Sequence, residues 1–144
     1  NNYNYNHEAD DIEWSNVGNT NIPRFPIEGM VTRFVGNEAN LGGAVYALKD
    51  LTVNENSVFT DNKAELGGAI YVAGNNTVIT YSNFTQTNAG NGGAIYVAGE
   101  NTEISHDSFI ELKSYYGGAV YVEGDDTTIY GSLCFSICST CINI

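Results

Sequence analysis

The sequence Gly42-Gly43-Ala44-Val45-Tyr46 decides the fold, because it returns three more times along the chain with only Val or Ile exchanged. The copies keep a strict 25-residue interval, and each retains the glycine doublet: Gly42 and Gly43, Gly67 and Gly68, Gly92 and Gly93, Gly117 and Gly118. Two other residue types keep the same interval: Phe34, Phe59, Phe84 and Phe109, and Thr52, Thr77, Thr102 and Thr127. A fixed period of this length indicates a repeat architecture such as a solenoid.

Each repeat has the composition of short strands and tight turns. The second unit runs Gly-Gly-Ala-Ile-Tyr-Val-Ala, then Gly-Asn-Asn, then Thr-Val-Ile-Thr-Tyr. Val, Ile, Tyr and Thr favour strands, whereas Gly and Asn accept the positive φ of sharp corners. Such a unit predicts one coil of a parallel β-helix, in which equivalent residues of successive repeats lie above one another at a strand spacing of about 4.8 Å. The spaced leucines of leucine-rich repeats are missing.

A longer motif, Phe-x-x-Asn followed by Gly-Gly-Ala-Val/Ile, is complete in residues 34–45 and 59–70. It resembles the repeat of the chlamydial polymorphic outer-membrane proteins and the similar repeat of adhesin-like surface proteins of methanogenic archaea. The third and fourth units match in part, because they carry Thr87 and Leu112 in place of the asparagine. The resemblance covers residues 34 to 133. It implies a right-handed parallel β-helix on a cell surface that serves attachment or assembly rather than catalysis.

The sequence therefore predicts an all-β fold, a single-stranded parallel β-solenoid of four to five 25-residue coils, in one domain over residues 1–144. The resemblance implies that this solenoid is right-handed. Four coils cover residues 34–133, an irregular N-terminal coil or cap covers 1–33, and an apolar strand with cysteines covers 134–144. Trp14 is expected to fill the cap, since terminal repeats close the core of a solenoid. Gly18-Asn19 echoes the turn at Gly74-Asn75 and indicates a degenerate first coil.

The two-residue period of strands assigns an inside and an outside to each coil. The inward columns are expected to be Val45, Ile70, Ile95 and Val120; Val72, Val97 and Val122; Ile79, Ile104 and Ile129; and the four phenylalanines. Asn54 replaces the isoleucine of the first coil, so Leu51 and Val53 should fill the core there. The outward column is Tyr46, Tyr71, Tyr96 and Tyr121. These rings either stabilise the sheet by stacking on one another or form a surface contact for a sugar or a partner.

Composition excludes several classes of partner. The net charge is −12, from 17 acidic against 5 basic residues, and this surface repels nucleic acid and anionic lipid. No apolar run is long enough to cross a membrane, and no signal peptide is present. Because the chain begins at Asn1, we expect that a leader has been removed or that the chain is part of a longer one. The expected location is extracellular.

The cysteines Cys134, Cys138 and Cys141 are the candidates for covalent assembly. Zinc requires four ligands, and neither another cysteine nor a histidine lies nearby in sequence. Two roles are therefore favoured over a metal or redox site at Cys138-x-x-Cys141: small buried hydrophobes, or disulfide partners with an odd thiol left for another molecule. Cys134 falls on the phenylalanine interval, so a fifth coil begins there without reaching a glycine doublet. The final strand is apolar on both faces. It is expected to leave an exposed edge whose unpaired backbone groups can pair with another chain.

No catalytic, cofactor or metal site is expected. Five acidic residues lie near the turn after the first strand of a coil: Glu100, Glu103, Glu123, Asp125 and Asp126. They form no repeating calcium-binding motif, so we expect them to make a solvent-exposed acidic edge. His7 and His106 are isolated, and the arginines Arg24 and Arg33 lie in the irregular lead-in, away from any carboxylate pair. Asn75 and Asn83 satisfy the glycosylation pattern, which arises often by chance in such turns.

Three functions follow as hypotheses. The favoured one is a non-enzymatic structural protein of the cell surface that assembles with copies of itself, head-to-tail and laterally, into a fibre, tube or sheath, with cysteine cross-links. The second is an adhesin segment that binds a surface or glycan ligand. The third is a fragment of a carbohydrate-active β-helix enzyme.

Overall fold

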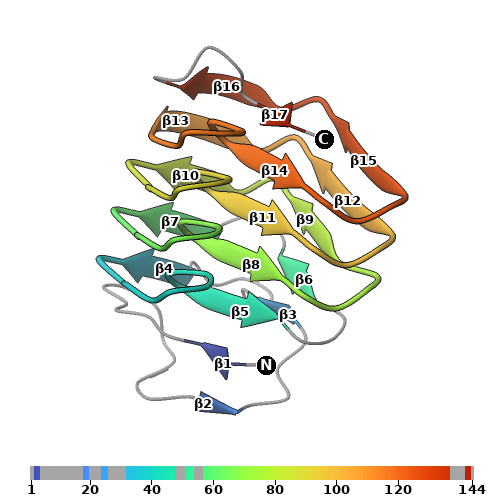
Figure 1. The fold of residues 1–144 in the computed structure, drawn as a ribbon, viewed down its shortest axis with the longest axis horizontal. Helices are drawn as coiled ribbons and strands as arrows, with labels where there is room; N and C mark the ends of the chain where they lie inside the picture. The colour runs from blue at the N-terminus through green and yellow to red at the C-terminus, as the bar shows by residue number, and fades with distance from the viewer. Residues whose placement is uncertain are drawn as a thin grey trace.

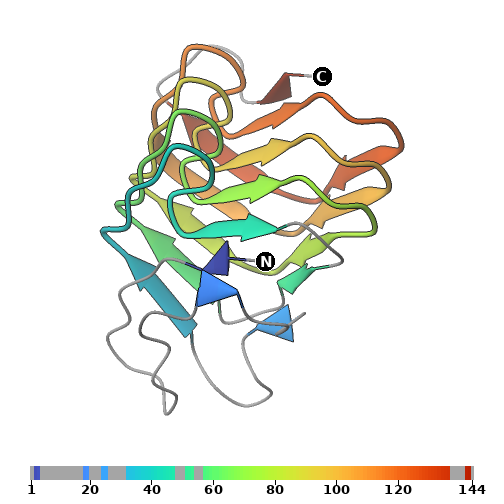
Figure 2. The ribbon, with the colours of Figure 1, turned by 60° about the horizontal axis from the view of Figure 1, so that its bottom comes forward.

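A computed structural model describes residues 2–3, 18–19, 24–25, 32–47, 51–53, 57–136 and 142–143. These residues form strands, bends and bridges, with no helix among them. The strands stack into three sheets that surround one core (Figures 1 and 2).

Sheet 1 has seven strands and sheets 2 and 3 have five each. Sheet 1 contains, in spatial order, β17 (Ile142–Asn143), β14 (Val120–Val122), β11 (Ile95–Val97), β8 (Ile70–Val72), β5 (Val45–Ala47), β1 (Asn2–Tyr3) and β2 (Gly18–Asn19). Sheet 2 contains β15 (Thr127–Tyr130), β12 (Thr102–Ser105), β9 (Val78–Thr80), β6 (Thr52–Val53) and β3 (Arg24–Phe25). Sheet 3 contains β16 (Leu133–Ser136), β13 (Ser108–Leu112), β10 (Asn83–Thr85), β7 (Ser57–Thr60) and β4 (Thr32–Val35).

The repeat period sets the strand register. Val45 pairs with Ile70, Ile70 with Ile95, and Ile95 with Val120, all in parallel and each one repeat further along the chain. Each coil crosses the front sheet of Figure 1 from left to right and returns behind it while it climbs, so the solenoid is right-handed. The predicted all-β, parallel β-solenoid is confirmed.

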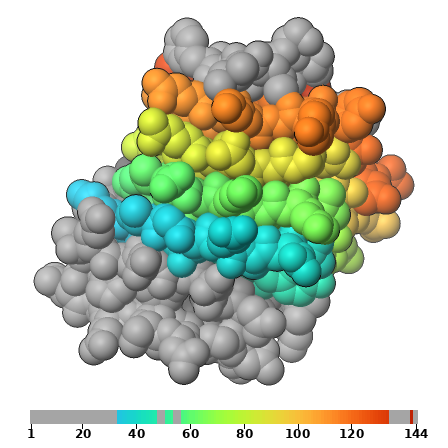
Figure 3. All heavy atoms as spheres, turned by 60° about the vertical axis from the view of Figure 1, so that its left-hand side comes forward, coloured from blue at the N-terminus to red at the C-terminus, as the bar shows by residue number. Residues whose placement is uncertain are grey.

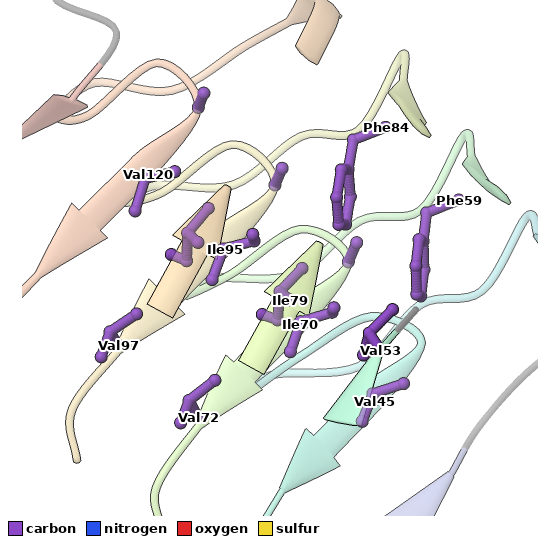
Figure 4. Packing of buried hydrophobic residues seen from close by; sticks show 14 of the residues in the cluster. Val45, Val53, Phe59, Ile70, Val72, Ile79, Phe84, Ile95, Val97 and Val120 are labelled. Carbon is purple, nitrogen blue, oxygen red and sulfur yellow. The ribbon is translucent and has the colours of Figure 1, made fainter. Parts of the chain in front are cut away.

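The predicted inward columns form the core. The four phenylalanines, the inward Val and Ile side chains of β5, β8, β11 and β14, and the Ile79 and Ile104 side chains are at most 3% exposed. Figure 4 shows Phe59 and Phe84 in one column, and Val45, Ile70, Ile95 and Val120 in another. Phe34, Phe59, Phe84 and Phe109 stack with ring centroids 4.7–5.1 Å apart. Ile129 is only partly buried and packs against this cluster.

The 25-residue interval of the threonines predicts that they lie above one another in sheet 2, and this prediction is wrong for Thr52. Thr52 pairs with Val78 rather than with Thr77, and Val53 pairs with Ile79. The sequence from Ala47 to Leu51 is one residue shorter than that from Val72 to Thr77, so the first coil enters sheet 2 one residue early. As expected, Leu51 and Val53 are buried and fill the core of this coil.

The N-terminal strands differ from the expected degenerate coil. β1 pairs with both β5 and β2, and both pairings are antiparallel. Gly18 and Asn19 therefore form a strand of sheet 1, rather than the counterpart of the Gly74-Asn75 turn. Arg24–Phe25 does form an extra rung, because it pairs in parallel with Thr52–Val53. Trp14 lies outside the described residues.

The C-terminal strands continue the solenoid further than expected. Cys134 pairs with Phe109 in register, which confirms the predicted start of a fifth coil. The chain then returns to sheet 1 without a glycine doublet, because Ile142 pairs with Val120. β17 is a terminal strand of sheet 1, with no described coil stacked beyond it. Cys138 and Cys141 lie outside the described residues.

Candidate functional site

The asparagine of the Phe-x-x-Asn motif fastens the bend that follows sheet 3. Asn62 is fully buried, and its Nδ2 donates a hydrogen bond of 2.9 Å to the carbonyl oxygen of Phe34. Its Oδ1 accepts bonds from the backbone N–H of Asn37 at 2.9 Å and from the Asn37 side chain at 3.1 Å. Thr87 and Leu112 fill the same buried column in later coils. The motif is therefore a structural clamp between neighbouring coils.

The glycine doublets allow close backbone packing where each coil enters sheet 1. Gly67 has φ +66°, and a Cβ on it would lie 2.2 Å from the Ile70 carbonyl oxygen. A Cβ on Gly68 would lie 2.1 Å from the carbonyl oxygen of Gly93 in the next coil. Only glycine fits both positions, which explains why the doublet recurs.

The tyrosine column lies on the outer side of sheet 1, as predicted. Tyr46, Tyr71, Tyr96 and Tyr121 stack with ring centroids 5.2, 5.1 and 5.0 Å apart. Tyr96 is nevertheless only 6% exposed, and its hydroxyl donates a 2.5 Å hydrogen bond to Glu123. Burial is the largest cause that raises the pKa of Tyr96, and this hydrogen bond raises the pKa further. The stacked rings therefore cover one another, and little of Tyr96 remains for a ligand.

A second aromatic column lies at the corner between sheets 2 and 3. The Tyr81 ring is 54% exposed and stacks on the ring of His106 at 4.6 Å. The His106 and Tyr130 rings also form a T-shaped pair, with centroids 5.3 Å apart and an interplanar angle of 84°. The Tyr130 hydroxyl donates a 3.0 Å hydrogen bond to Glu103. His106 is therefore part of an aromatic stack, a role that its isolation in the sequence did not indicate.

Asp107 is a buried acid that the sequence analysis missed. It is 1% exposed, and its Oδ1 accepts a 2.8 Å hydrogen bond from the backbone N–H of Ser82. Within the described part of the chain, Oδ2 has no hydrogen-bond partner. Burial raises the pKa of Asp107 to about 8, despite the hydrogen bonds from the backbones of Ser82 and Ser105. The equivalent residues of the neighbouring repeats are Ser82 and Ser132. The change from serine to aspartate at this repeat position is the sequence signal that could have identified Asp107.

Two outward columns flank the bend that follows sheet 3 and form a polar groove. The bend residues Asp61, Gln86 and Glu111 have φ of 56°, 56° and 57°. Two residues further on, Lys63 pairs with Asn88 and Asn88 with Lys113 through parallel bridges. A groove of about 580 Å³ lies between the columns. We call it the bend–bridge groove, and its lining residues are Asp61, Gln86, Asn88, Glu111 and Lys113.

The repeat matches a known family model over a short stretch. Residues 51–73 match the Chlamydia polymorphic membrane protein repeat. This stretch runs from β6 in sheet 2 through β8 in sheet 1, and it includes Phe59, Asn62, Gly67 and Gly68. The resemblance inferred from the motif is therefore confirmed at these residues. No curated protein and no solved structure matches the chain.

The other predicted positions fall as follows. Glu100, Glu123, Asp125 and Asp126 are exposed, whereas Glu103 is half-buried. Within the described ranges, no group of three or more His, Cys, Asp or Glu side chains could hold a metal ion. In the same residues, no helix has the length and apolar character needed to cross a membrane. His7 lies outside the described residues, and only the backbone of Cys134 and Arg24 is described.

Proposed function

We propose that this chain is an adhesin-like structural segment of a cell-surface protein. The observation that carries the proposal is the repeat itself: residues 51–73 match a repeat named for membrane proteins, and its motif residues build a continuous β-solenoid. The inner rungs present outward side chains on a backbone that is hydrogen-bonded to the rungs above and below. We infer that this scaffold serves attachment or spacing rather than catalysis.

Surface labelling tests this function. Antibodies raised against the purified chain should label intact cells of the source organism, and external protease should remove the label. Beads coated with the chain should adhere to cells or extracellular matrix more than beads coated with albumin. Labelling only after permeabilisation, together with no adhesion above the albumin control, would contradict the proposal.

Self-assembly through the solenoid ends is the second candidate function. It is favoured by the exposed apolar side chains of the last coils. Among the described residues, six of the seven exposed large hydrophobic side chains lie between residues 110 and 142: Ile110, Tyr115, Tyr116, Tyr130, Leu133 and Ile142. The strands β15, β16 and β17 are the last described strands of their sheets, and exposed edge strands of this kind pair with other chains.

The N-terminal strands restrict the geometry of such an assembly. β2 is antiparallel to β1, and β1 is antiparallel to β5, so β2 runs in the same direction as the solenoid strands. A β17–β2 contact between copies would therefore be parallel. Sheet 1 has seven described strands, whereas sheets 2 and 3 have five each. A contact through sheet 1 would therefore leave a gap of two strand positions between the described strands of sheet 2 in one copy and those of sheet 2 in the next, and the same gap in sheet 3. We propose that head-to-tail contact is made through sheet 1, with Cys134, Cys138 and Cys141 as the cross-linking candidates.

Electron microscopy and non-reducing electrophoresis test the assembly. The proposal predicts filaments, and cross-linked species that disappear with reductant. A Cys134→Ser, Cys138→Ser, Cys141→Ser variant should form filaments without covalent species. Monomers at every concentration tested, with or without reductant, would exclude self-assembly and leave the adhesin-like function standing.

A further inference from the structure

We propose that the bend–bridge groove binds a neutral linear glycan. This inference rests on the adhesin-like function proposed above and names the class of its ligand. The groove is distinct from the tyrosine column, for which the sequence left two roles open, stacking within the sheet or a surface contact. It lies where the chain bends after sheet 3, on loops at the left of Figure 1 that come forward in Figure 3.

The groove has the shape expected for a linear polymer. Asp61, Gln86 and Glu111 belong to successive coils and occupy one column, because they hold the same position in successive repeats. Each step along the column therefore advances by one strand spacing, about 4.8 Å. Asn88 and Lys113 line the same groove from the neighbouring column. The groove thus follows the solenoid axis over three coils, and each coil presents a similar set of outward positions to the next unit of a polymer.

The lining chemistry fits hydroxyl groups. The groove contains two carboxylates, two amides and one ammonium group, with no apolar side chain in its lining. A sugar hydroxyl both donates and accepts hydrogen bonds, so it pairs with all three kinds of group. An apolar ligand would remove these groups from water without replacing their hydrogen bonds.

Charge excludes a polyanionic ligand. Asp61 and Glu111 outweigh Lys113 within the groove, and the whole chain carries a net charge of −12. A sulfated or uronic acid polymer would therefore be repelled over a long range at low ionic strength. A neutral glycan meets no such repulsion.

The backbone holds the lining residues in place before a ligand arrives. The Gln86 N–H donates to the Ile110 carbonyl at 3.0 Å, and the Asn88 N–H donates to the Asn62 carbonyl at 2.9 Å. The Gln86 Nε2 also donates a 3.0 Å hydrogen bond to the Glu111 Oε2. Pre-organised side chains lose less conformational freedom on binding, which favours a weak polar ligand.

Titration calorimetry on the whole chain tests the groove directly. The probes are neutral oligosaccharides of about four to six sugars, with β-1,4-glucose, β-1,3-glucose and α-mannose linkages, and a heparin oligosaccharide of similar length. Glu111→Gly and Lys113→Ala remove two lining groups. Glycine is compatible with the bend, because Gly36 has φ +67° at the same place in the first coil. The matched control is Asp126→Gly, which removes an exposed carboxylate at φ 54° outside the groove.

We expect saturable binding of at least one neutral oligosaccharide, weakened about ten-fold or more in both groove variants and unchanged in the control. Binding of none of the neutral probes, equal weakening in the control, or binding of heparin alone would each overturn the proposal. If coated beads adhere to cells equally with and without the groove substitutions, the groove assignment fails while the adhesin-like function remains.

Discussion

Asn62 connects two coils through one amide group. Its side chain bonds the carbonyl of Phe34 in β4 and the N–H of Asn37 at the bend that follows, both in the preceding coil. A backbone polar group that is buried without a partner costs about 1–3 kcal/mol. The asparagine therefore makes the bend compatible with a dry interior.

Replacing this amide should destabilise the fold. Asn62→Ala should lower the free energy of unfolding by about 2–4 kcal/mol, because it removes the buried hydrogen bonds to the Phe34 carbonyl and the Asn37 N–H and opens a cavity. Thr87→Leu is the matched control, since Leu112 fills the same column and, among the described residues, the Thr87 hydroxyl has no hydrogen-bond partner. Urea denaturation measures both. Similar losses in the two variants would show that Asn62 acts by packing alone.

Asp107 should make stability depend on pH. Its pKa is raised from 3.8 to about 8, so the folded protein holds the proton more tightly than the unfolded chain. Its contribution is therefore complete below about pH 4 and is lost as the pH rises through 8. Wild type should lose about 2–3 kcal/mol of stability relative to Asp107→Asn between about pH 6 and about pH 9.

Denaturation curves of both proteins across this pH range measure the effect. The amide oxygen that Asp107→Asn introduces still accepts the Ser82 N–H, so the variant isolates the charge. Asp125→Asn, at an exposed site, is the control and should follow the wild-type profile. Parallel profiles for wild type and Asp107→Asn would contradict a protonated, buried Asp107.

Single-residue roles were only partly predictable from sequence. The inward phenylalanines follow from their 25-residue interval because identical side chains stack in a solenoid. The groove residues Asp61, Gln86 and Glu111 differ from coil to coil, so they give no repeat signal. Their shared feature is a backbone conformation with φ of 56–57°, and an interval of residue types does not report that conformation.

At the level of elements, the glycine doublet sets how closely one coil approaches the next. The backbone N–H of Gly68 donates to the carbonyl of Gly92 at 3.1 Å. A methyl group on Gly68 would overlap the Gly93 carbonyl oxygen at 2.1 Å. The coils cannot separate locally without breaking neighbouring ladder hydrogen bonds.

Substitution in the doublet should therefore be severe. Gly68→Ala should cost more than about 4 kcal/mol or prevent folding, because backbone atoms rather than a flexible side chain must move. Gly36→Asp should change the melting temperature little, since nothing lies within 4 Å of its Cβ and Asp61 occupies the same bend with φ 56°. Circular dichroism melting compares them. A folded Gly68→Ala variant with wild-type stability would refute the close-approach argument.

The strand register in sheet 2 differs from the register that the repeat interval predicts. Thr52 keeps the repeat interval, yet it pairs with Val78. The buried partner decides the register: Val53 lies opposite Ile79, and a shift of one residue would turn Val53 outward. Hydrophobic burial therefore overrides the sequence interval in the first coil.

At the level of the molecule, acidic side chains accumulate along one line of turns. Glu100 and Asp125 are exposed and hold the same position in successive repeats, so they lie one coil apart. With a net charge of −12, like charges at this spacing oppose folding. Raising NaCl from about 0.02 to 0.5 M should therefore raise the melting temperature by a few degrees.

Scanning calorimetry measures this salt dependence. The double variant Asp125→Asn, Asp126→Asn should show a smaller increase than wild type, whereas Asn75→Ser should retain the full increase. A melting temperature that falls with salt would mean that attractive ion pairs outweigh repulsion.

The overall solenoid was predictable, but its N-terminal strands were not. Four coils follow from one repeated motif, whereas β1 and β2 contain only Asn2–Tyr3 and Gly18–Asn19. Such short strands carry no periodicity, so their antiparallel pairing depends on the exposed edge that β5 provides. That pairing is a tertiary effect.

The parallel stacking of coils is tested most directly by nuclear Overhauser contacts between backbone protons of the isotope-labelled chain. The account predicts contacts between Tyr71 and Tyr96 and between Phe84 and Phe109, each pair separated by one repeat length. It also predicts contacts between Val53 and Ile79, whose separation is one residue longer than the repeat. Antiparallel contact patterns among these strands, or an unbroken repeat interval throughout sheet 2, would contradict it.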